Sequence, residues 1–137
     1  MPDFPEAHRD LLSAPVATLS TLGRDGFPQV TATWFVFDPE DGVLKLWLSS
    51  GRQKTRNLRR DPRCTLLIMD PDSTQRTLEV RAHAEVADDK ERAFVEQLVP
   101  KYGEFVRNIG DQPPDYRVLV TLRPTKINVT DLRRPRP

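Results

Sequence analysis

Apolar and polar residues alternate with a period of two along much of the chain, which is the pattern of half-buried β-strands. The alternation is clearest between residues 76 and 87. One side of this segment would carry Leu78, Val80, Ala82, Ala84 and Val86, and the other side Glu79, Arg81, His83 and Glu85. We therefore expect a strand here with one face in the core and the other in solvent.

Six other segments have strand character, and turn sequences separate the first of them. "GRDG" at 23–26 and "DPEDG" at 38–42 are typical of hairpin connections, because glycine supplies the positive φ that a tight turn requires. The first three strands are therefore expected to form a meander. The six segments are 15–22, 28–37, 43–49, 64–70, 116–122 and 126–132.

Three segments suit helices instead. The second of them is poor in β-branched residues, stops before Pro62 and has Ser49 or Ser50 near its N-cap. The third has an acidic first turn. The three are 5–13, with Leu11 and Leu12 facing inward; 51–61; and 88–103, with Phe94, Leu98 and Tyr102 along one face.

Strands in this order, with helices between and after them, do not suit a parallel sheet. We expect a mainly β fold, a small antiparallel barrel of six to seven strands, because closure removes exposed strand edges. The length of 137 residues indicates one domain, which we assign to residues 1–132. The tail "RRPRP" at 133–137 is expected to be disordered.

Composition excludes several classes of protein. No apolar run is long enough for a membrane-spanning helix, and the N-terminus lacks the pattern of a signal peptide, so we expect a cytoplasmic protein without a membrane partner. The single cysteine, Cys64, rules out an intramolecular disulfide, and no close set of ligands predicts a metal site. No nucleophile elbow, P-loop or G-x-G-x-x-G is present. An enzyme with this inventory would depend on a bound cofactor.

The most basic stretch of the chain, 52–63, follows a Ser-Ser-Gly turn at the end of a predicted strand. Arg52, Lys54 and Thr55 would lie in the first helical turn, where unpaired N–H groups and the helix dipole attract phosphate. The other interpretation from spacing alone is a solvated, arginine-rich helix face. Nucleic-acid binding is not expected, because no aromatic residue within the stretch offers a stacking platform.

Two motifs carry a family resemblance. "GFPQVT" at 26–31 and "RQKTRNLRRDPR" at 52–63, in this order and about twenty residues apart, resemble the flavin/deazaflavin oxidoreductases related to pyridoxamine-phosphate oxidase. The similarity extends over roughly residues 11–130. It implies an FMN-binding-like split β-barrel and a homodimer, with a flavin-type cofactor in a groove between the two chains.

The resemblance also implies roles for particular residues. The segment 29–33 would pass along the cofactor ring, a Ser-Ser pair would lie at the ring and ribityl chain, and the start of the following helix would hold the phosphate. Further arginines would extend the positive surface. The implied cofactor-binding residues are Gln29, Val30, Thr31, Ala32, Thr33, Ser49, Ser50, Arg52, Lys54, Thr55, Arg56, Asn57 and Arg60, with Arg59 beside them.

Two departures select the branch of the family. Pyridoxamine-phosphate oxidases carry Ser-Arg-Lys where this chain has Arg52-Gln53-Lys54, and they end in a segment with tryptophan that "TDLRRPRP" does not match. The pattern looks more like the branch that uses coenzyme F420, a deazaflavin whose phosphate carries a lactyl-oligoglutamate tail. We expect hydride transfer between F420 and a small organic substrate. The alternatives are an FMN-dependent oxidase or reductase, and a non-catalytic cofactor carrier.

Other residues are assigned structural roles. Trp34 and Trp47 are expected in the barrel core or dimer interface, Cys64 in the interior and His83 on the barrel surface. The connection 103–116 is either an ordinary surface loop or a cover for the cofactor groove. No residue is identified as a catalytic acid or base.

Overall fold

The computed structural model describes residues 2–110 and 113–133. Within these ranges the chain forms seven strands and four short helical segments. In chain order they are η1 (Glu6–Ser13), β1 (Ala17–Leu22), β2 (Pro28–Thr33), β3 (Val36–Asp38), β4 (Val43–Ser49), α1 (Gln53–Arg60), β5 (Arg63–Met69), β6 (Arg76–Asp88), α2 (Val95–Tyr102), η2 (Glu104–Asn108) and β7 (Arg117–Asp131). No helix in the described ranges is long and apolar enough to cross a membrane.

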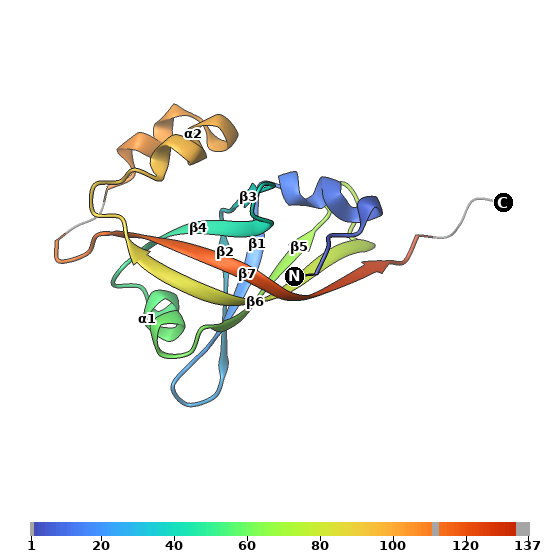
Figure 1. Ribbon diagram of the computed structural model, residues 1–137, viewed down its shortest axis with the longest axis horizontal. Helices are drawn as coiled ribbons and strands as arrows, with labels where there is room; N and C mark the ends of the chain where they lie inside the picture. The colour runs from blue at the N-terminus through green and yellow to red at the C-terminus, as the bar shows by residue number, and fades with distance from the viewer. Residues whose placement is uncertain (1, 111–112, 134–137) are drawn as a thin grey trace.

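The strands form one antiparallel sheet in the order β2-β1-β5-β6-β7-β4-β3. The edge strands β2 and β3 are not hydrogen-bonded to each other, so the described sheet curls without closing, as in a split barrel. β6 and β7 are its longest strands and curve side by side across the molecule (Figure 1). The prediction of a mainly β, antiparallel split barrel with six to seven strands is confirmed.

The expected strand 28–37 is wrong, because the chain leaves one edge of the sheet at Trp34 and rejoins it at the other. β2 pairs with β1, and β3 pairs with β4, so the expected three-strand meander is also wrong. The backbone at the break is held by α2: Phe35 N–H donates to the Tyr102 hydroxyl (3.0 Å), and Lys101 Nζ donates to the Phe35 carbonyl (2.7 Å). These bonds satisfy the backbone N–H and carbonyl groups of Phe35, which no longer pair with a neighbouring strand.

The expected strands 116–122 and 126–132 are one strand, β7. The sequence "RPT" at 123–125 suggested an interruption because proline cannot donate to a ladder. In the sheet, Pro124 lies opposite Ala82 and Lys126 opposite Arg81, so Thr125 is the extra residue of a register shift. The Thr125 hydroxyl donates to the Arg81 carbonyl (3.2 Å) across this bulge.

The expected helix 88–103 is shorter, since α2 begins only at Val95. Asp89 organises the residues before it: its carboxylate accepts hydrogen bonds from the N–H groups of Ala93 (2.9 Å) and Phe94 (3.1 Å). The same carboxylate accepts a bond from Trp47 Nε1 (2.9 Å), which ties this segment to β4. The acidic cluster that we interpreted as a first helical turn is therefore a turn preceding the helix.

Two apolar clusters stabilise the fold. The larger lies inside the curled sheet and includes the inward face of β6, as the alternation predicted, together with Leu11 and Leu12 of η1. The smaller is formed by α2 and η2 against the outer side of the sheet, where Trp34 and Trp47 pack partly buried. The two tryptophans thus lie between sheet and helices rather than in the barrel core.

Arg76 joins η1 to the far end of the sheet. Its side chain is buried, and its Nε donates to Asp70 Oδ2 (2.9 Å) while Nη1 donates to the Ala7 carbonyl (2.9 Å). The guanidinium also pairs with Asp10. A buried guanidinium is tolerated in this position because carboxylates and a carbonyl satisfy its donors.

The ammonium of Lys101 predicts a pH dependence of stability. Burial lowers the pKa of Lys101 to about 8, whereas the pKa of a lysine in an unfolded chain is about 10.4. Between these values the unfolded chain binds more protons, so the free energy of unfolding should rise as the pH increases. Urea unfolding at pH 7.5 and 9.5 should show this rise in the parent protein and a smaller one in Lys101→Met; equal rises would contradict the burial of this charge.

Candidate cofactor-binding site

A cavity of about 700 Å³ lies where β2, β4, the start of α1 and the start of β7 meet. The pairing of Ser49 with Arg117 brings the end of β4 and the beginning of β7 to the same end of the sheet. α1 and the α2–η2 unit flank this end (Figure 1). The lining residues are Val16, Thr31, Ala32, Thr33, Trp34, Trp47, Leu48, Ser49, Arg52, Lys54, Gly110, Asp115 and Arg117.

The helix that opens beside the cavity has no side-chain cap. Arg52 is the N-cap residue of α1, and no side chain accepts a bond from the first turn. Ser49 and Ser50, which we expected near the N-cap, precede Arg52 and do not cap the helix with their side chains. Ser50 is engaged elsewhere: its N–H donates to the Tyr116 carbonyl (2.7 Å), and its Oγ accepts a bond from Tyr116 N–H (3.0 Å). The first N–H groups of α1 consequently remain available to an anion.

Three cationic side chains line this end of the cavity. Burial lowers the pKa of Lys54, and the neighbouring guanidiniums of Arg52 and Arg117 lower it further. Lys54 Nζ lies 3.4 Å from the Thr31 hydroxyl. Within the described ranges, neither Lys54 nor Arg52 has a carboxylate at ion-pair distance. Lys54 and Arg52 therefore place positive charge at this end of the cavity, which favours the binding of an anion.

Two other predicted site residues, Thr55 and Asn57, anchor α1 to the sheet. The buried Thr55 hydroxyl donates to the Ser49 carbonyl (2.7 Å). The buried Asn57 amide donates to Thr21 Oγ1 (3.1 Å) and to Gln29 Oε1 (3.0 Å). These bonds fix α1 against β1, β2 and β4, so Thr55 and Asn57 position the helix rather than line the cavity.

The remaining predicted residues lie around the cavity rather than in it. Arg56 donates to the Gly51 carbonyl and to Gln53, and Arg60 donates to the Leu22 carbonyl, both on the exposed side of α1. Val30 faces outward from β2 and is 59% exposed. Of the thirteen predicted residues, the cavity lining includes Thr31, Ala32, Thr33, Ser49, Arg52 and Lys54. Their contact with a cofactor stays a prediction.

The opposite wall of the cavity is apolar and aromatic. Trp34 stacks on Tyr102, with ring centroids 4.5 Å apart and an interplanar angle of 12°. Trp47 lies under the guanidinium of Arg117, 4.9 Å from its ring centroid, and Val16 adds an aliphatic surface. A cavity with a cationic end and a flat apolar wall suits a planar ligand that carries an anionic group.

Sequence reasoning missed the contribution of β7 and left the role of the connection before it open. Gly110 and Asp115 belong to the 103–116 connection and reach the cavity lining, which favours the interpretation of this loop as part of the site. Arg117 reaches the cavity because it pairs in the sheet with Ser49, which lies sixty-eight positions earlier in the chain. Its only sequence signal was its place as the first basic residue of a predicted strand.

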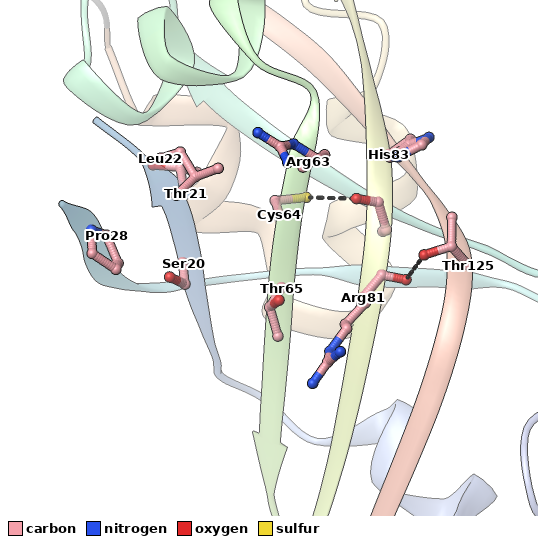
Figure 2. A pocket seen from close by; sticks show the side chains of 11 residues that line it. Ser20, Thr21, Leu22, Pro28, Arg63, Cys64, Thr65, Arg81, His83 and Thr125 are labelled. Carbon is pink, nitrogen blue, oxygen red and sulfur yellow. Dashed lines mark hydrogen bonds between the residues drawn. The ribbon is translucent and has the colours of Figure 1, made fainter. Parts of the chain in front are cut away.

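A second hollow, of about 300 Å³, is lined by residues of β1, β5 and β6, with Pro28 and Thr125 beside them (Figure 2). Its basic residues are occupied: Arg63 pairs with Asp61 (2.7 Å) and Arg81 with Glu79 (3.1 Å). Cys64 is buried there as predicted, and burial raises the pKa of its thiol to about 12, so it is not a reactive thiolate. This hollow is a weaker candidate for an anion site.

Residues 4–131 match the family model described as pyridoxamine 5′-phosphate oxidase. The chain belongs to the pyridoxamine 5′-phosphate oxidase family. This family includes oxidoreductases that use flavin-type cofactors, so the cavity between the cationic start of α1 and the tryptophans is the place in this family member where such a cofactor would be sought.

Solved structures agree with membership of the pyridoxamine 5′-phosphate oxidase family. An F420 reductase is 36% identical, with a TM-score of 0.76, and the match covers 91% of this chain and 98% of the reductase. A conserved hypothetical protein from Mycobacterium tuberculosis is 29% identical, with a TM-score of 0.70 and coverage of 94% and 86%. The haem storage protein HutZ from Vibrio cholerae is 20% identical, with a TM-score of 0.74 and coverage of 91% and 94%, which shows the shared fold alone.

Proposed function

We propose that this protein binds coenzyme F420 and transfers hydride between it and a small organic substrate. The observation that carries the proposal is the uncapped start of α1, with Arg52 and Lys54, facing a cavity with an aromatic wall. The 36% identity to an F420 reductase supports the choice of cofactor. Among the described residues of the cavity, we assign none as the proton donor.

The residues present fit such a cofactor. Lys54, Arg52 and the free N–H groups of α1 would hold its phosphate, and the segment Thr31–Thr33 would lie along its ring. Trp34 and Trp47 would exclude water from one side of the ring. When bound, the deazaflavin supplies the hydride chemistry. The contribution of this chain is to orient the ring and neutralise the phosphate.

The exposed arginines of α1 favour F420 over FMN. Arg56 and Arg60 continue the positive surface away from the cavity, further than a single phosphate requires, and Arg59 beside them pairs with Asp88 (3.4 Å). Arginine suits the carboxylates of an oligoglutamate tail, because its planar fork binds them bidentately. Such exposed contacts contribute little one by one, so several together would be needed.

A second copy of this chain would complete the cavity. Val16 in the lining is 46% exposed, and Val30 and Phe27 beside β2 are 59% and 75% exposed. Apolar side chains gathered at one sheet edge are typical of a surface that another chain covers. We therefore propose a homodimer with the cofactor held between the protomers.

The second candidate is an FMN-dependent oxidase or reductase that uses the same cavity, since a flavin has the same ring shape and a phosphate. The third is a non-catalytic cofactor carrier. Storage of haem is less favoured, because neither of the two histidines, His8 and His83, lines the cavity.

Turnover tests the proposed activity. Reduced F420 would be incubated with the protein and a panel of enones, quinones and nitroarenes, and its oxidation followed by absorbance against a protein-free control. We expect catalysed oxidation with at least one acceptor. Binding of F420 without oxidation by any acceptor would favour the carrier.

A further inference from the structure

Among the described residues that line the cavity, Asp115 is the single acidic one. The hydrogen bonds between Ser50 and Tyr116 hold the adjacent backbone against the turn that opens α1. As a result the Asp115 carboxyl lies directly over Gly51: a Cβ atom on Gly51 would be 2.0 Å from Asp115 Oδ1. The carboxylate therefore borders the same turn as the proposed phosphate site.

This carboxylate is not neutralised by a contact of its own. Within residues 2–110 and 113–133, Asp115 has no ion pair or hydrogen bond from its side chain. Arg52 and Lys54 line the same cavity, so among the described residues this carboxylate lies in a lining that also carries positive charge. An anion that enters will be attracted by the cations and repelled by Asp115.

The repulsion depends on the charge of the entering phosphate. A phosphomonoester is close to a dianion at neutral pH, since its second pKa is about 6, whereas a phosphodiester carries a single charge. We propose that Asp115 is a specificity-determining residue that disfavours phosphomonoester dianions and so favours a phosphodiester ligand. The inference rests on the proposed function, in which F420 is a phosphodiester and FMN a phosphomonoester.

The charge of Asp115 can be tested with FMN and riboflavin, which differ only by the phosphate. Affinities would be measured by flavin fluorescence at pH 5.5 and pH 7.5, and the FMN-to-riboflavin ratio isolates the phosphate contribution. In the parent protein the ratio of FMN affinity to riboflavin affinity should rise from pH 5.5 to pH 7.5. In Asp115→Asn that rise should be about fivefold larger. The same rise in both proteins would overturn the proposal.

A second variant moves the Asp115 charge away from the turn without removing it. Gly51 does not have the positive φ that only glycine tolerates, so Gly51→Ala should fold while its methyl group pushes the Asp115 carboxylate aside. It should increase the ratio at pH 7.5 as Asp115→Asn does, and the double variant should gain nothing more. Asp3→Asn, which removes an exposed carboxylate outside the cavity, is the matched control and should leave the ratio unchanged.

Inorganic phosphate separates this inference from the identity of the cofactor. At pH 8, phosphate should raise the melting temperature of Asp115→Asn more than that of the parent protein. Equal shifts would overturn the role of Asp115 even if F420 binds tightly. A larger shift in the variant, in a protein that fails to bind F420, would support Asp115 and remove only the proposed function.

Discussion

Lys54→Met should weaken the binding of coenzyme F420 by about 1–3 kcal/mol, or roughly 5–150-fold, because a charge-assisted hydrogen bond to the phosphate is lost. The same variant should be at least as stable as the parent protein without ligand. Burial and the neighbouring guanidiniums already lower the pKa of Lys54, so its charge opposes folding of the empty protein. Methionine keeps an apolar stem of similar length without that charge.

Fluorescence titration and urea unfolding measure the two effects separately. Lys126→Met is the control, since Lys126 is an exposed lysine of β7 outside the cavity and should change neither affinity nor stability appreciably. Unchanged affinity in Lys54→Met would place the phosphate elsewhere. Loss of stability together with affinity would indicate that Lys54 acts structurally.

Arg76→Met should lower the free energy of unfolding by roughly 3–5 kcal/mol, the usual cost of breaking a buried charge network from one side. The substitution leaves Asp70 buried without its guanidinium and removes the link from η1 through the Ala7 carbonyl. Arg123→Met removes an exposed pair with Glu85 on the same sheet and should have little effect. Urea denaturation of the three proteins at pH 7 checks this; similar stabilities for both variants would contradict the account of Arg76.

The pH dependence of this network has a definite sign. The hydrogen bond from Arg76 lowers the pKa of Asp10 below its ordinary value of about 3.9. The stability that this carboxylate contributes is therefore present above that value and is lost as the pH falls further. Arg76→Met should consequently show a weaker acid dependence between pH 5 and pH 3 than the parent protein.

The parts of the fold that local pattern determines were predictable. The alternation along β6 places its charged residues outward because a strand reverses its side chains at each step. The Ser-Ser-Gly turn followed by Arg52 and Lys54 predicted a cationic helix start. This was possible because the residues that begin a helix and the basic residues of its first turn are neighbours in the sequence.

The parts that depend on contacts distant in sequence were not predictable. The break at Phe35 is stabilised by Lys101 and Tyr102, more than sixty positions away, and nothing near Phe35 signals it. Pro124 is tolerated within β7 because the bulge at Thr125 absorbs the register shift against β6. Arg117 and Asp115 join the cavity only because β7 pairs with β4, which the order of segments along the chain does not reveal.

The most direct measurement compares F420 with the corresponding deazaflavin nucleoside that lacks the phosphate and tail. Affinities of both ligands would be determined by fluorescence titration for the parent protein and for an Arg52→Met/Lys54→Met double variant. If the start of α1 holds the phosphate, the parent protein will bind F420 far more tightly than the nucleoside, and the double variant will lose most of that difference. An equal preference for F420 in both proteins would contradict the assignment of this site.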